Sequence, residues 1–475
     1  MRDRYESPLC ERYASARMQY IFSPDFKFTS WRKMWLYLAE AEKELGLDIT
    51  DEQLDEIRAH LNDVDYDAAA AYEKRLRHDV MAHLRAFADQ CPKAGPILHL
   101  GATSCYVGDN TDVWQLSEAL KSLRGQLLGV MAALSDFALK NADVPTLAYT
   151  HFQAAQPTTV GKRATLWLQD FLMDFDRLTF ELSRLKPLGC KGTTGTGASF
   201  LMLFNGDESK VRALEGLIAR KMGFESCVAV SGQTYTRKVD AFVLNVLSGI
   251  AQSASKMATD LRLLSHLKEF DEPFESEQVG SSAMAYKRNP MRSERVCALA
   301  RYVMTDALNP AWTAATQWME RTLDDSANRR IALPEAFLAA DAILTLCRNL
   351  ISGGRVYPGV MRRHLNEEMP FMATENILMR AVELGGDRQK LHEKIREYSV
   401  ETAARVKLEG GENDLLDKLK ADPAFHLDDA ALAEILDVKQ FIGCAPSQTR
   451  AFVEEAVRPV LEACGAGDGT DEVRV

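Results

Sequence analysis

Three long stretches with apolar residues at helical spacing constrain the fold of this 475-residue chain more than any other feature. Apolar side chains recur every three or four residues over 111–140, 160–186 and 237–270, and none of these stretches contains a proline. This spacing places one apolar stripe along each helix. Helices of about 25 residues or more are typical of a bundle in which long helices pack side by side. We therefore predict an all-α fold with these stripes in its core.

The rest of the chain suggests three domains. Residues 1–108 carry shorter helical patterns, residues 109–356 hold the long helices, and residues 357–475 carry short helices again. A glycine pair and Pro358 mark the second boundary. We find no βαβ rhythm and no internal repeat, and predict a short extended segment only at 227–231, where the sequence CVAVS is rich in β-formers. The small, polar residues from Gly465 onward are expected to be frayed.

The overall charge excludes some classes of function. Lysine and arginine number 57 and aspartate and glutamate 68, which gives a net charge of −11. A nucleic-acid-binding protein usually has a basic face, so that class is disfavoured. No apolar run approaches the ~18 residues of a membrane span, and the first residues lack the apolar core of a signal peptide. Nine scattered cysteines without a CxxC pair indicate reduced thiols, so we expect a cytoplasmic protein.

The segment GSSAMAYKRNP at 280–290 is the most informative one for function. It lies between two helical patterns and is therefore expected to be a loop. Four cations, Lys287, Arg288, Arg292 and Arg295, follow Gly280 within fifteen residues. In a chain with a net negative charge, such a cluster suggests a site for carboxylates or phosphate. A solvated charged face at the start of a helix remains an equal alternative.

Two further segments contain histidines. His151 lies in THFQAAQP at 150–157, and a group that titrates near neutrality suits proton transfer, although a structural histidine is the alternative. His78 and His83 lie in RLRHDVMAH at 75–83. Their spacing is five residues, whereas the HExxH motif uses four to place both rings on one helical face. We therefore predict no metal site.

Two polar segments are open to more than one interpretation. KGTTGTGA at 191–198 does not fit the glycine-rich phosphate loops, and is either a mobile active-site loop or a structural turn. RTLDDSANRR at 321–330 alternates cations with hydroxyl and amide groups. A helix terminus of this composition could hold phosphate. Ion pairs to Asp324 and Asp325 are the alternative use of its arginines.

Together these segments resemble one enzyme family. The loop 280–290 resembles the GSSxMPxKxNP signature of the aspartase/fumarase superfamily, with Ala285 in place of the usual proline. The lost proline frees one φ angle and adds an N–H group, so a more mobile loop is expected. The amino-acid sequence from about Tyr5 to Arg458 is similar to that of the adenylosuccinate lyases of animal type. In those enzymes glutamine is common at the position of Gly197. The segments that carry this resemblance lie at 75–83, 99–112, 150–163, 191–200, 231–240, 286–295, 320–330 and 370–377.

The resemblance implies a fold, an assembly and a reaction. Members of this family have a mostly helical three-domain subunit, and their middle domains form a twenty-helix core in a homotetramer whose active sites draw residues from three subunits. In that assembly, neighbouring subunits would cover long helices that are apolar on too many sides for a monomer. The reaction implied is β-elimination of fumarate from adenylosuccinate, giving AMP, and from SAICAR, giving AICAR, in purine synthesis. No metal and no organic cofactor are implied.

The resemblance also assigns roles to residues. Ser281 is implied as the base that removes a carbon proton, with Ser282 as the alternative, helped by the charge of Lys287. His151 is implied as the general acid at the leaving nitrogen, and Glu294 as a group that orients the catalytic residues. Thr103, Ser104 and Gln233 match positions that hold the succinyl part of the substrate. The positions that match binding of the nucleotide and its phosphate are Arg12, Tyr13, Arg77, His78, Asp79, Arg295, Arg321, Ser326 and Arg330.

The sequence disfavours three competing interpretations. A sister enzyme such as argininosuccinate lyase is disfavoured by the segments at 75–83, 286–295 and 323–330, which carry the nucleotide-specific wording. A non-catalytic copy of the fold is disfavoured because His151, Ser281 and Lys287 are all present. A helical scaffold that binds nucleic acid or protein would need an extended basic or apolar stripe, whereas the cations cluster in short segments as for a small polyanion.

Overall fold

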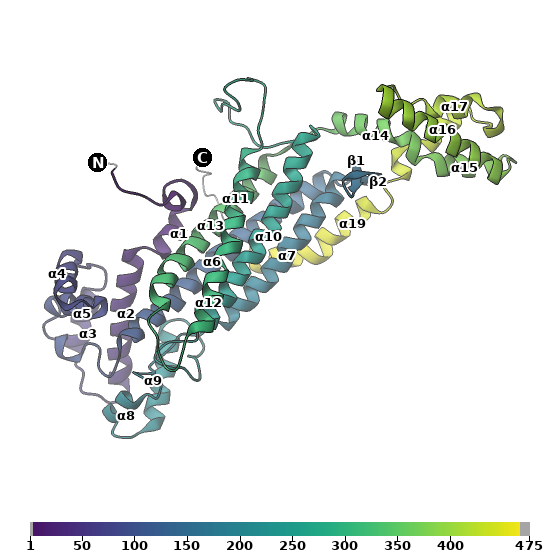
Figure 1. Cartoon of the computed structure of the whole chain (residues 1–475). Coiled ribbons are helices and arrows are strands. Elements are labelled where there is room, and N and C mark those ends of the chain that lie inside the picture. Colours follow the sequence, from purple (N-terminus) through teal and green to yellow (C-terminus); the bar gives the residue numbers. More distant parts are fainter. Residues whose placement is uncertain (1–2, 466–475) are drawn as a thin grey trace.

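Five long helices pack side by side and form a bundle through the middle of the molecule (Figure 1). They are α6 (Ser104–Lys140), α7 (Val160–Arg184), α10 (Lys238–His266), α11 (Met291–Asp306) and α13 (Asp325–Gly353). The computed structural model describes residues 3–465 of the chain. The prediction of an all-α fold is confirmed, and each of the three predicted long helices is present, with α6 beginning seven residues before position 111.

The apolar stripes of these helices meet in one large hydrophobic cluster. On α6 the leucines of the predicted stripe are almost fully buried, and helices α7, α10 and α13 contribute their own stripes to the same cluster. Burying one such leucine side chain contributes about 1.5–3 kcal/mol. The bundle is therefore the principal stabilising unit of the chain. The α6 residues in question are Leu116, Leu120, Leu123, Leu127 and Leu134.

A second hydrophobic cluster lies beneath an N-terminal lobe. This lobe is built from α2 (Pro24–Glu44), α3 (Asp51–Ala59), α4 (Tyr66–Leu76), α5 (Asp79–Gln90), α8 (Ala198–Leu203) and α9 (Glu208–Lys221), and the short α1 (Ala16–Ile21) joins it to the bundle. Local signals define these helices. Ser23 accepts a hydrogen bond from Phe26 N–H at 3.2 Å ahead of Pro24, and Thr50 and Gln53 form a capping box.

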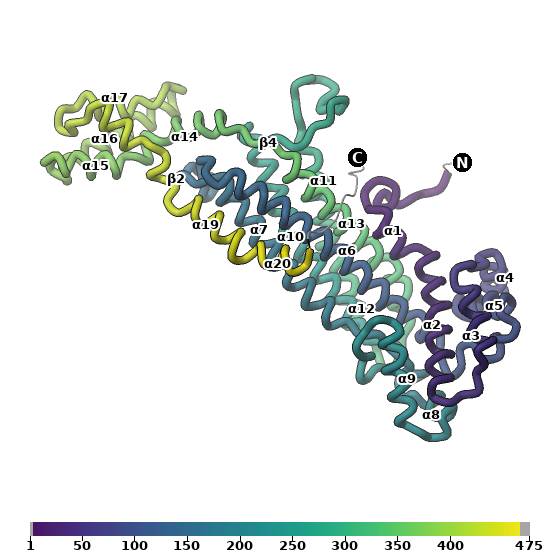
Figure 2. Tube along the Cα trace, turned by 180° about the vertical axis from the view of Figure 1, so that it is seen from behind, coloured from purple at the N-terminus to yellow at the C-terminus, as the bar shows by residue number. Residues whose placement is uncertain are grey.

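A third cluster holds a C-terminal lobe at the opposite end of the bundle (Figure 1). The chain then turns back, and its last helices run along α7 in both views (Figures 1 and 2). Val453 and Val457, from this returning segment, are buried in the cluster of the bundle. The lobe contains α14 (Pro358–Met372), α15 (Thr374–Glu383), α16 (Arg388–Glu409), α17 (Leu415–Ala421) and α18 (Asp429–Ile435), and the returning helices are α19 (Ala445–Phe452) and α20 (Arg458–Cys464).

The strands are short and lie where the sequence did not predict them. β1 (Pro145–Thr150) and β2 (Gln153–Thr159) form an antiparallel hairpin, and β3 (Phe270–Asp271) pairs with β4 (Arg355–Val356). The prediction of an extended segment at 227–231 is wrong, because within residues 3–465 this segment pairs with no strand. Its backbone is held instead by a hydrogen bond from Val228 N–H to Pro187 O. The remaining short helices are η1 (Leu9–Tyr13), η2 (Gly95–Ile97), α12 (Leu308–Thr316), η3 (Pro423–Phe425), η4 (Val438–Gln440) and η5 (Val453–Val457).

The hydrophobic clusters divide the chain less simply than its sequence texture does. Position 108 falls within the first turns of α6, and Pro358 opens α14 as expected of a break. The three-domain division at 108 and 357 stays a prediction, and the expected fraying after Gly465 lies outside the described residues. Within residues 3–465, no helix is long and apolar enough to cross a membrane.

Candidate active site

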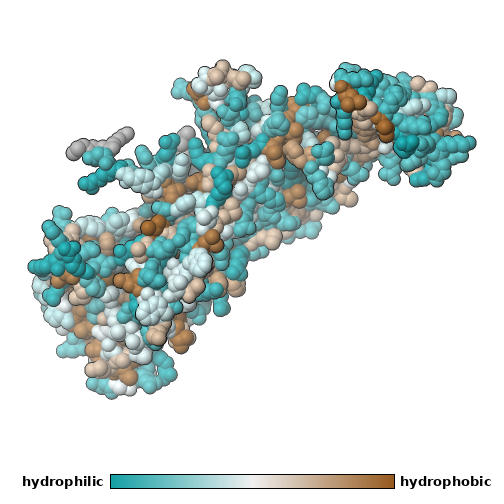
Figure 3. All heavy atoms as spheres, in the orientation of Figure 1, coloured by the Kyte–Doolittle hydropathy of each residue, from teal (hydrophilic) through white to brown (hydrophobic). Residues whose placement is uncertain are grey.

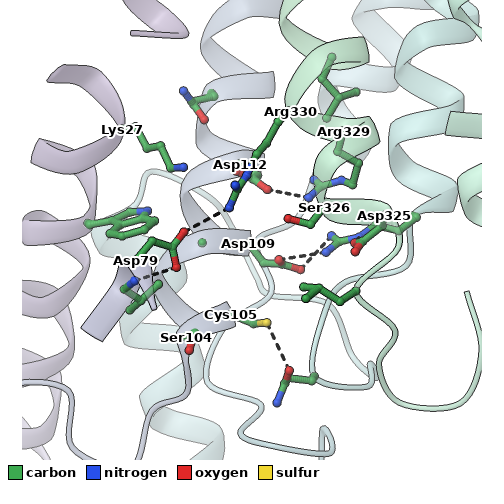
Figure 4. A pocket seen from close by; sticks show the side chains of 18 of the residues that line it. Lys27, Asp79, Ser104, Cys105, Asp109, Asp112, Asp325, Ser326, Arg329 and Arg330 are labelled. Carbon is green, nitrogen blue, oxygen red and sulfur yellow. Dashed lines mark hydrogen bonds and ion pairs between the residues drawn. The ribbon is translucent and has the colours of Figure 1, made fainter. Parts of the chain in front are cut away.

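The helices α5, α6 and α13 begin around a common cavity of about 660 Å³ (Figure 4). His78 is the N-cap of α5, Thr103 that of α6, and Asp324 that of α13. The N-termini of helices carry unsatisfied N–H groups and a partial positive charge, which favour anions. No side chain caps α6 or α13. The cavity therefore has the electrostatics of an anion site before any side chain is considered.

Most of the residues predicted to bind substrate line this cavity. Eight of the twelve do so, and Thr103 directly precedes one of them on α6. The eight are Arg77, His78, Asp79, Ser104, Gln233, Arg321, Ser326 and Arg330. Six charged residues that the sequence analysis did not name also line it, namely Lys27, Glu73, Asp109, Asp112, Arg237 and Arg329. Asp109 and Asp112 stand four and seven residues after Cys105 in the segment 99–112, a helical spacing that could have pointed to the same face.

The contacts of its two ring nitrogens favour one tautomer of His78. Its Nδ1 accepts the N–H of Met81 at 3.4 Å, and its Nε2 lies 3.2 Å from Ser104 Oγ. An Nδ1 that accepts leaves the proton on Nε2, which then donates to Ser104. His83, the other histidine of that segment, stacks on Phe28 with ring centres 3.7 Å apart, and burial lowers its pKa to about 4. His83 is thus a structural residue.

Of the five arginines that line the cavity, four are held by carboxylates among the described residues. Arg330 pairs with Asp79 at 3.2 Å, and Arg321 pairs with Asp325 at 2.9 Å. The backbone of Gln233 is fixed by a hydrogen bond to Glu320 O at 2.9 Å, directly before Arg321. These contacts bring three segments that are distant in sequence to one site.

A buried network of charges forms the floor of the cavity. Arg237, 2% exposed, donates to Asp325 at 2.7 Å and to Asp109 at 3.0 Å. Arg329 donates to Asp240 at 2.7 Å and to Asp112 at 2.9 Å. Burial raises the pKa of Asp109. Burial alone would also raise the pKa of Asp325. The positive charges of Arg237 and the neighbouring arginines outweigh this effect, so the pKa of Asp325 is lowered. The network fixes the relative positions of α6, α10 and α13.

The signature loop 280–290 is an irregular loop, as predicted, and does not line the cavity. Ser281 Oγ accepts hydrogen bonds from the N–H groups of Ala283 at 3.3 Å and Met284 at 3.2 Å. Ser282 makes no side-chain hydrogen bond to any of the residues 3–465. A Cβ at Gly280 would lie 2.2 Å from Lys287 O, so only glycine allows this closure of the loop.

In the cationic cluster of this loop, Arg288 and Arg292 make anchoring contacts, whereas Lys287 has no ion pair among residues 3–465. Arg292 donates to Asn349 at 2.6 Å and to Glu275 at 3.0 Å, and Arg288 lies over the Phe274 ring. Glu272 accepts the N–H groups of Arg292 and Ser293, and so caps α11. Lys287 is exposed and forms no ion pair with any of the residues 3–465. The first three contacts position the loop, and Lys287 is available to a ligand.

His151 and Phe152 form the two-residue tip of the β1–β2 hairpin. Both have left-handed backbones, with φ of 54° and 56°. A two-residue hairpin with two positive φ values usually has Asn-Gly, so a non-glycine pair here holds strain. The Tyr149 and Phe152 rings lie 5.7 Å apart and support the tip. The hairpin presents the imidazole of His151 to solvent.

The last group of predicted residues lies where η1 meets α11. Arg295 lies over the ring of Tyr13 at 5.6 Å, next to Arg12. Glu294 is exposed in the first turn of α11. Within this one chain the predicted site residues thus fall into separate groups. The cavity lies at the N-terminus of α5. In Figure 1 the signature loop projects beyond α11, and the β1–β2 hairpin lies beside α14.

Comparison with known proteins decides the family. The family described as "Lyase" matches residues 25–305, and "Adenylosuccinate lyase C-terminus" matches 370–452. Adenylosuccinate lyase of Saccharomyces cerevisiae is 50% identical over 97% of this chain and 96% of its own length. The chain belongs to the adenylosuccinate lyase family. The same enzyme of Schizosaccharomyces pombe is 49% identical over 96% and 95%, and that of Schistosoma mansoni is 48% identical over 97% and 96%.

Membership of the adenylosuccinate lyase family confirms the resemblance seen in the sequence and makes the chain a carbon–nitrogen lyase. Solved structures agree in fold. The 3-carboxy-cis,cis-muconate lactonizing enzyme of Pseudomonas putida superposes with a TM-score of 0.80 at 23% identity, covering 94% of this chain and 97% of its own. A fumarate lyase of Mesorhizobium sp. gives 0.79 at 22% over 95% and 100%. These two likenesses concern the fold alone.

Proposed function

We propose that this chain eliminates fumarate from adenylosuccinate to give AMP, and from SAICAR to give AICAR, by general acid–base catalysis. The observation that carries the proposal is the anion-binding cavity at three helix N-termini, in a chain about half identical to known adenylosuccinate lyases. The substrate carries a phosphate and two carboxylates. Helix N-termini together with arginines are the protein groups that suit such a polyanion.

Ser281 is proposed as the base. A free serine hydroxyl is far too weak an acid to be ionised, so its oxyanion needs stabilisation. The N–H groups of Ala283 and Met284 already point at Ser281 Oγ, and Lys287 offers an unpaired ammonium. This arrangement supports Ser281 over Ser282. As Ser281 takes the carbon proton, the charge that develops on the substrate carboxylates is stabilised by N–H groups and cations.

His151 is proposed as the general acid. The purine nitrogen that leaves must gain a proton as the carbon–nitrogen bond breaks. The strained tip of the β1–β2 hairpin holds the imidazole exposed and free to enter a partner's site. Glu294, on the first turn of α11, is proposed to orient the loop groups. Thr103, Ser104 and Gln233 are proposed to hold the succinyl part. The proposed nucleotide and phosphate residues are Arg12, Tyr13, Arg77, His78, Asp79, Arg295, Arg321, Ser326 and Arg330.

A homotetramer with shared sites accounts for the separation of these groups. His151, Ser281 and Lys287 do not line the cavity of their own chain. On α7 the side chains of Leu166, Met173 and Phe180 are 47%, 64% and 53% exposed, and they recur at intervals of seven residues. Such a spacing is typical of a helix–helix interface. Hydrophobic side chains also reach the surface along the bundle (Figure 3). We propose that copies of the bundle associate through this face.

The proposed location is the cytoplasm. All nine cysteines lie within the described residues, and none of them is in a disulfide. Reduced thiols are typical of that compartment.

The ultraviolet absorbance of the purified protein mixed with adenylosuccinate tests the activity. Loss of the succinyl-purine signal, with AMP and fumarate formed in equal amounts, is the expected result. An unchanged absorbance in the presence of folded, oligomeric protein would overturn the proposal.

Mixing two inactive variants, His151→Gln and Ser281→Ala, tests the shared site. Activity should return at least tenfold above either variant after subunit exchange, and no recovery would contradict sharing.

A further inference from the structure

Lys27, on α2, lines the cavity and has no role in the scheme above. Its ammonium lies 5.1 Å from the centre of the Trp31 ring and 5.4 Å from that of Phe28. Its side chain makes no hydrogen bond and no ion pair with any of the residues 3–465. In Figure 4 the side chain extends into the cavity towards Arg330 and Asp112.

The other cations of the cavity are in a different state. Six cationic side chains line it within the described part of the chain, and four of them are in ion pairs with carboxylates at 2.7–3.2 Å. Of the remaining two, Arg77 is exposed and Lys27 is partly enclosed. A ligand that reaches Lys27 has no ion pair to break. The four paired cations are Arg237, Arg321, Arg329 and Arg330.

The surroundings of Lys27 favour an incoming anion. Burial lowers the pKa of its ammonium, Asp112 opposes this effect, and Arg330 lowers the pKa further. Lys27 has thus lost hydration and is repelled by a second cation on the far side of the cavity. An oxyanion placed between the two cations would relieve both effects. The titratable groups that face Lys27 are Glu73 on α4, Asp79 and His83 on α5, Asp112 on α6 and Arg330 on α13.

We infer that Lys27 binds the phosphate of the substrate together with Arg330 and Ser326. The inference rests on the proposed function, which counts Arg330 and Ser326 among the residues that bind the nucleotide and its phosphate. Arg330 supplies a planar, two-pronged donor, and Lys27 supplies a compact charge from the opposite helix. Lys27 thereby links α2 of the N-terminal lobe to the ligand and, through Arg330, to α13.

Binding of AMP and of adenosine to the whole protein, measured by calorimetry, tests this role without relying on turnover. Lys27→Met should weaken AMP binding at least tenfold and change adenosine binding less than twofold, because adenosine lacks the phosphate. Lys33→Met is the matched control. Lys33 is on the same helix, is half-buried and lies over the Trp114 ring at 5.5 Å, but does not line the cavity. It should leave both affinities unchanged.

The pH dependence of AMP binding separates a binding role from a structural one. Phosphate is already a dianion above pH 7, since its second pKa is about 6. AMP binding should therefore weaken as the pH rises through the pKa of Lys27, which burial lowers from its ordinary value. In Lys27→Arg that weakening should move to higher pH, because guanidinium keeps its proton. A purely structural lysine would leave the pH profile unmoved.

The outcomes are distinct. A loss specific to AMP of tenfold or more in Lys27→Met, with the shifted profile in Lys27→Arg, supports the inference. A smaller loss, an equal loss for adenosine, or an unmoved profile overturns it. A wild-type protein that binds AMP but does not convert adenylosuccinate would instead overturn the proposed function.

Discussion

The floor of the cavity and the two loops proposed for catalysis are built in opposite ways. On the floor, the charges of Arg237, Asp109 and Asp325 are buried and paired with one another. On the loops, His151 and Lys287 are exposed and carry no ion pair within residues 3–465. A buried charge must be paired to be tolerated, whereas an exposed one needs no partner. The contrast suggests that one chain preforms the binding site and delivers the reacting groups to its neighbours.

The largest effect is expected in the exposed loops that are proposed for catalysis. His151→Gln should lower kcat by about 10²–10⁴-fold, the usual contribution of a general acid. AMP binding should change far less than kcat, because the cations of the cavity, and not His151, are proposed to hold the phosphate of AMP. Steady-state kinetics and calorimetry measure the two quantities.

A second histidine provides the control for His151. His426 is also exposed and also has a positive φ, of 51°, but lies in the C-terminal lobe. His426→Gln should leave kcat unchanged. Near-normal turnover in His151→Gln would remove His151 from its proposed role. It would also mean that an exposed loop side chain without an ion pair does not indicate catalysis in this protein.

The next effect concerns the paired floor. Asp325→Asn should destabilise the protein by about 3 kcal/mol, because it removes one of the two carboxylates that pair with the buried charge of Arg237. Denaturant unfolding measures this loss. Asp324→Asn is the control, since Asp324 is exposed and, within residues 3–465, its side chain bonds only to Thr322 and Gln317. Equal stability of the two variants would show that pairing does not hold the floor together.

A smaller effect is expected at a buried acid that has no partner. Glu42 lies fully buried in the N-terminal lobe, and burial raises its pKa to about 8. Neither of its carboxyl oxygens is hydrogen-bonded to any of the described residues 3–465. The folded state therefore retains a proton that the unfolded chain releases near its ordinary value of 4.5. Stability contributed by this group is full below about pH 4.5 and is lost as the pH rises towards 8.

Replacing that acid tests the argument. Glu42→Met should raise the free energy of unfolding by about 1–3 kcal/mol at pH 8, and little at pH 4.5, because a neutral side chain of similar length removes the buried charge. Chemical denaturation across this pH range measures the difference. An equal effect at both values of pH would show that packing, and not the charge of Glu42, sets the result.

The sequence predicted the bundle well because its signal is local and repeated. An apolar residue every three or four positions over 30 residues leaves little choice of structure, and the leucines of α6 are buried as expected. The hairpin that holds His151 was missed for the opposite reason. Its turn uses His-Phe, which lacks the Asn-Gly signal, and its strands form only because they pair with each other.

The site was predicted in part. The motif residues His78, Ser104 and Arg330 line one cavity, and their role in substrate binding stays a prediction. Lys27 was missed because it stands in α2 among aromatic residues, where nothing in the spacing separates a cavity lysine from a surface one. The partners of Arg237 were also missed, since ion pairs between residues 88 and 128 positions apart leave no local pattern.

The smallest effect tests whether the signature loop tolerates its missing proline. Ala285 N–H donates no hydrogen bond within residues 3–465, so Ala285→Pro removes no contact. Fixing one φ angle should favour the ordered loop by about 0.4–1 kcal/mol, provided that the loop's backbone accepts it. Turnover should therefore change less than tenfold. Ala283→Pro is the matched variant, because Ala283 N–H donates to Ser281 Oγ at 3.3 Å. It should lower kcat far more. Equal effects would mean that loop mobility, and not the donors around Ser281, limits the rate.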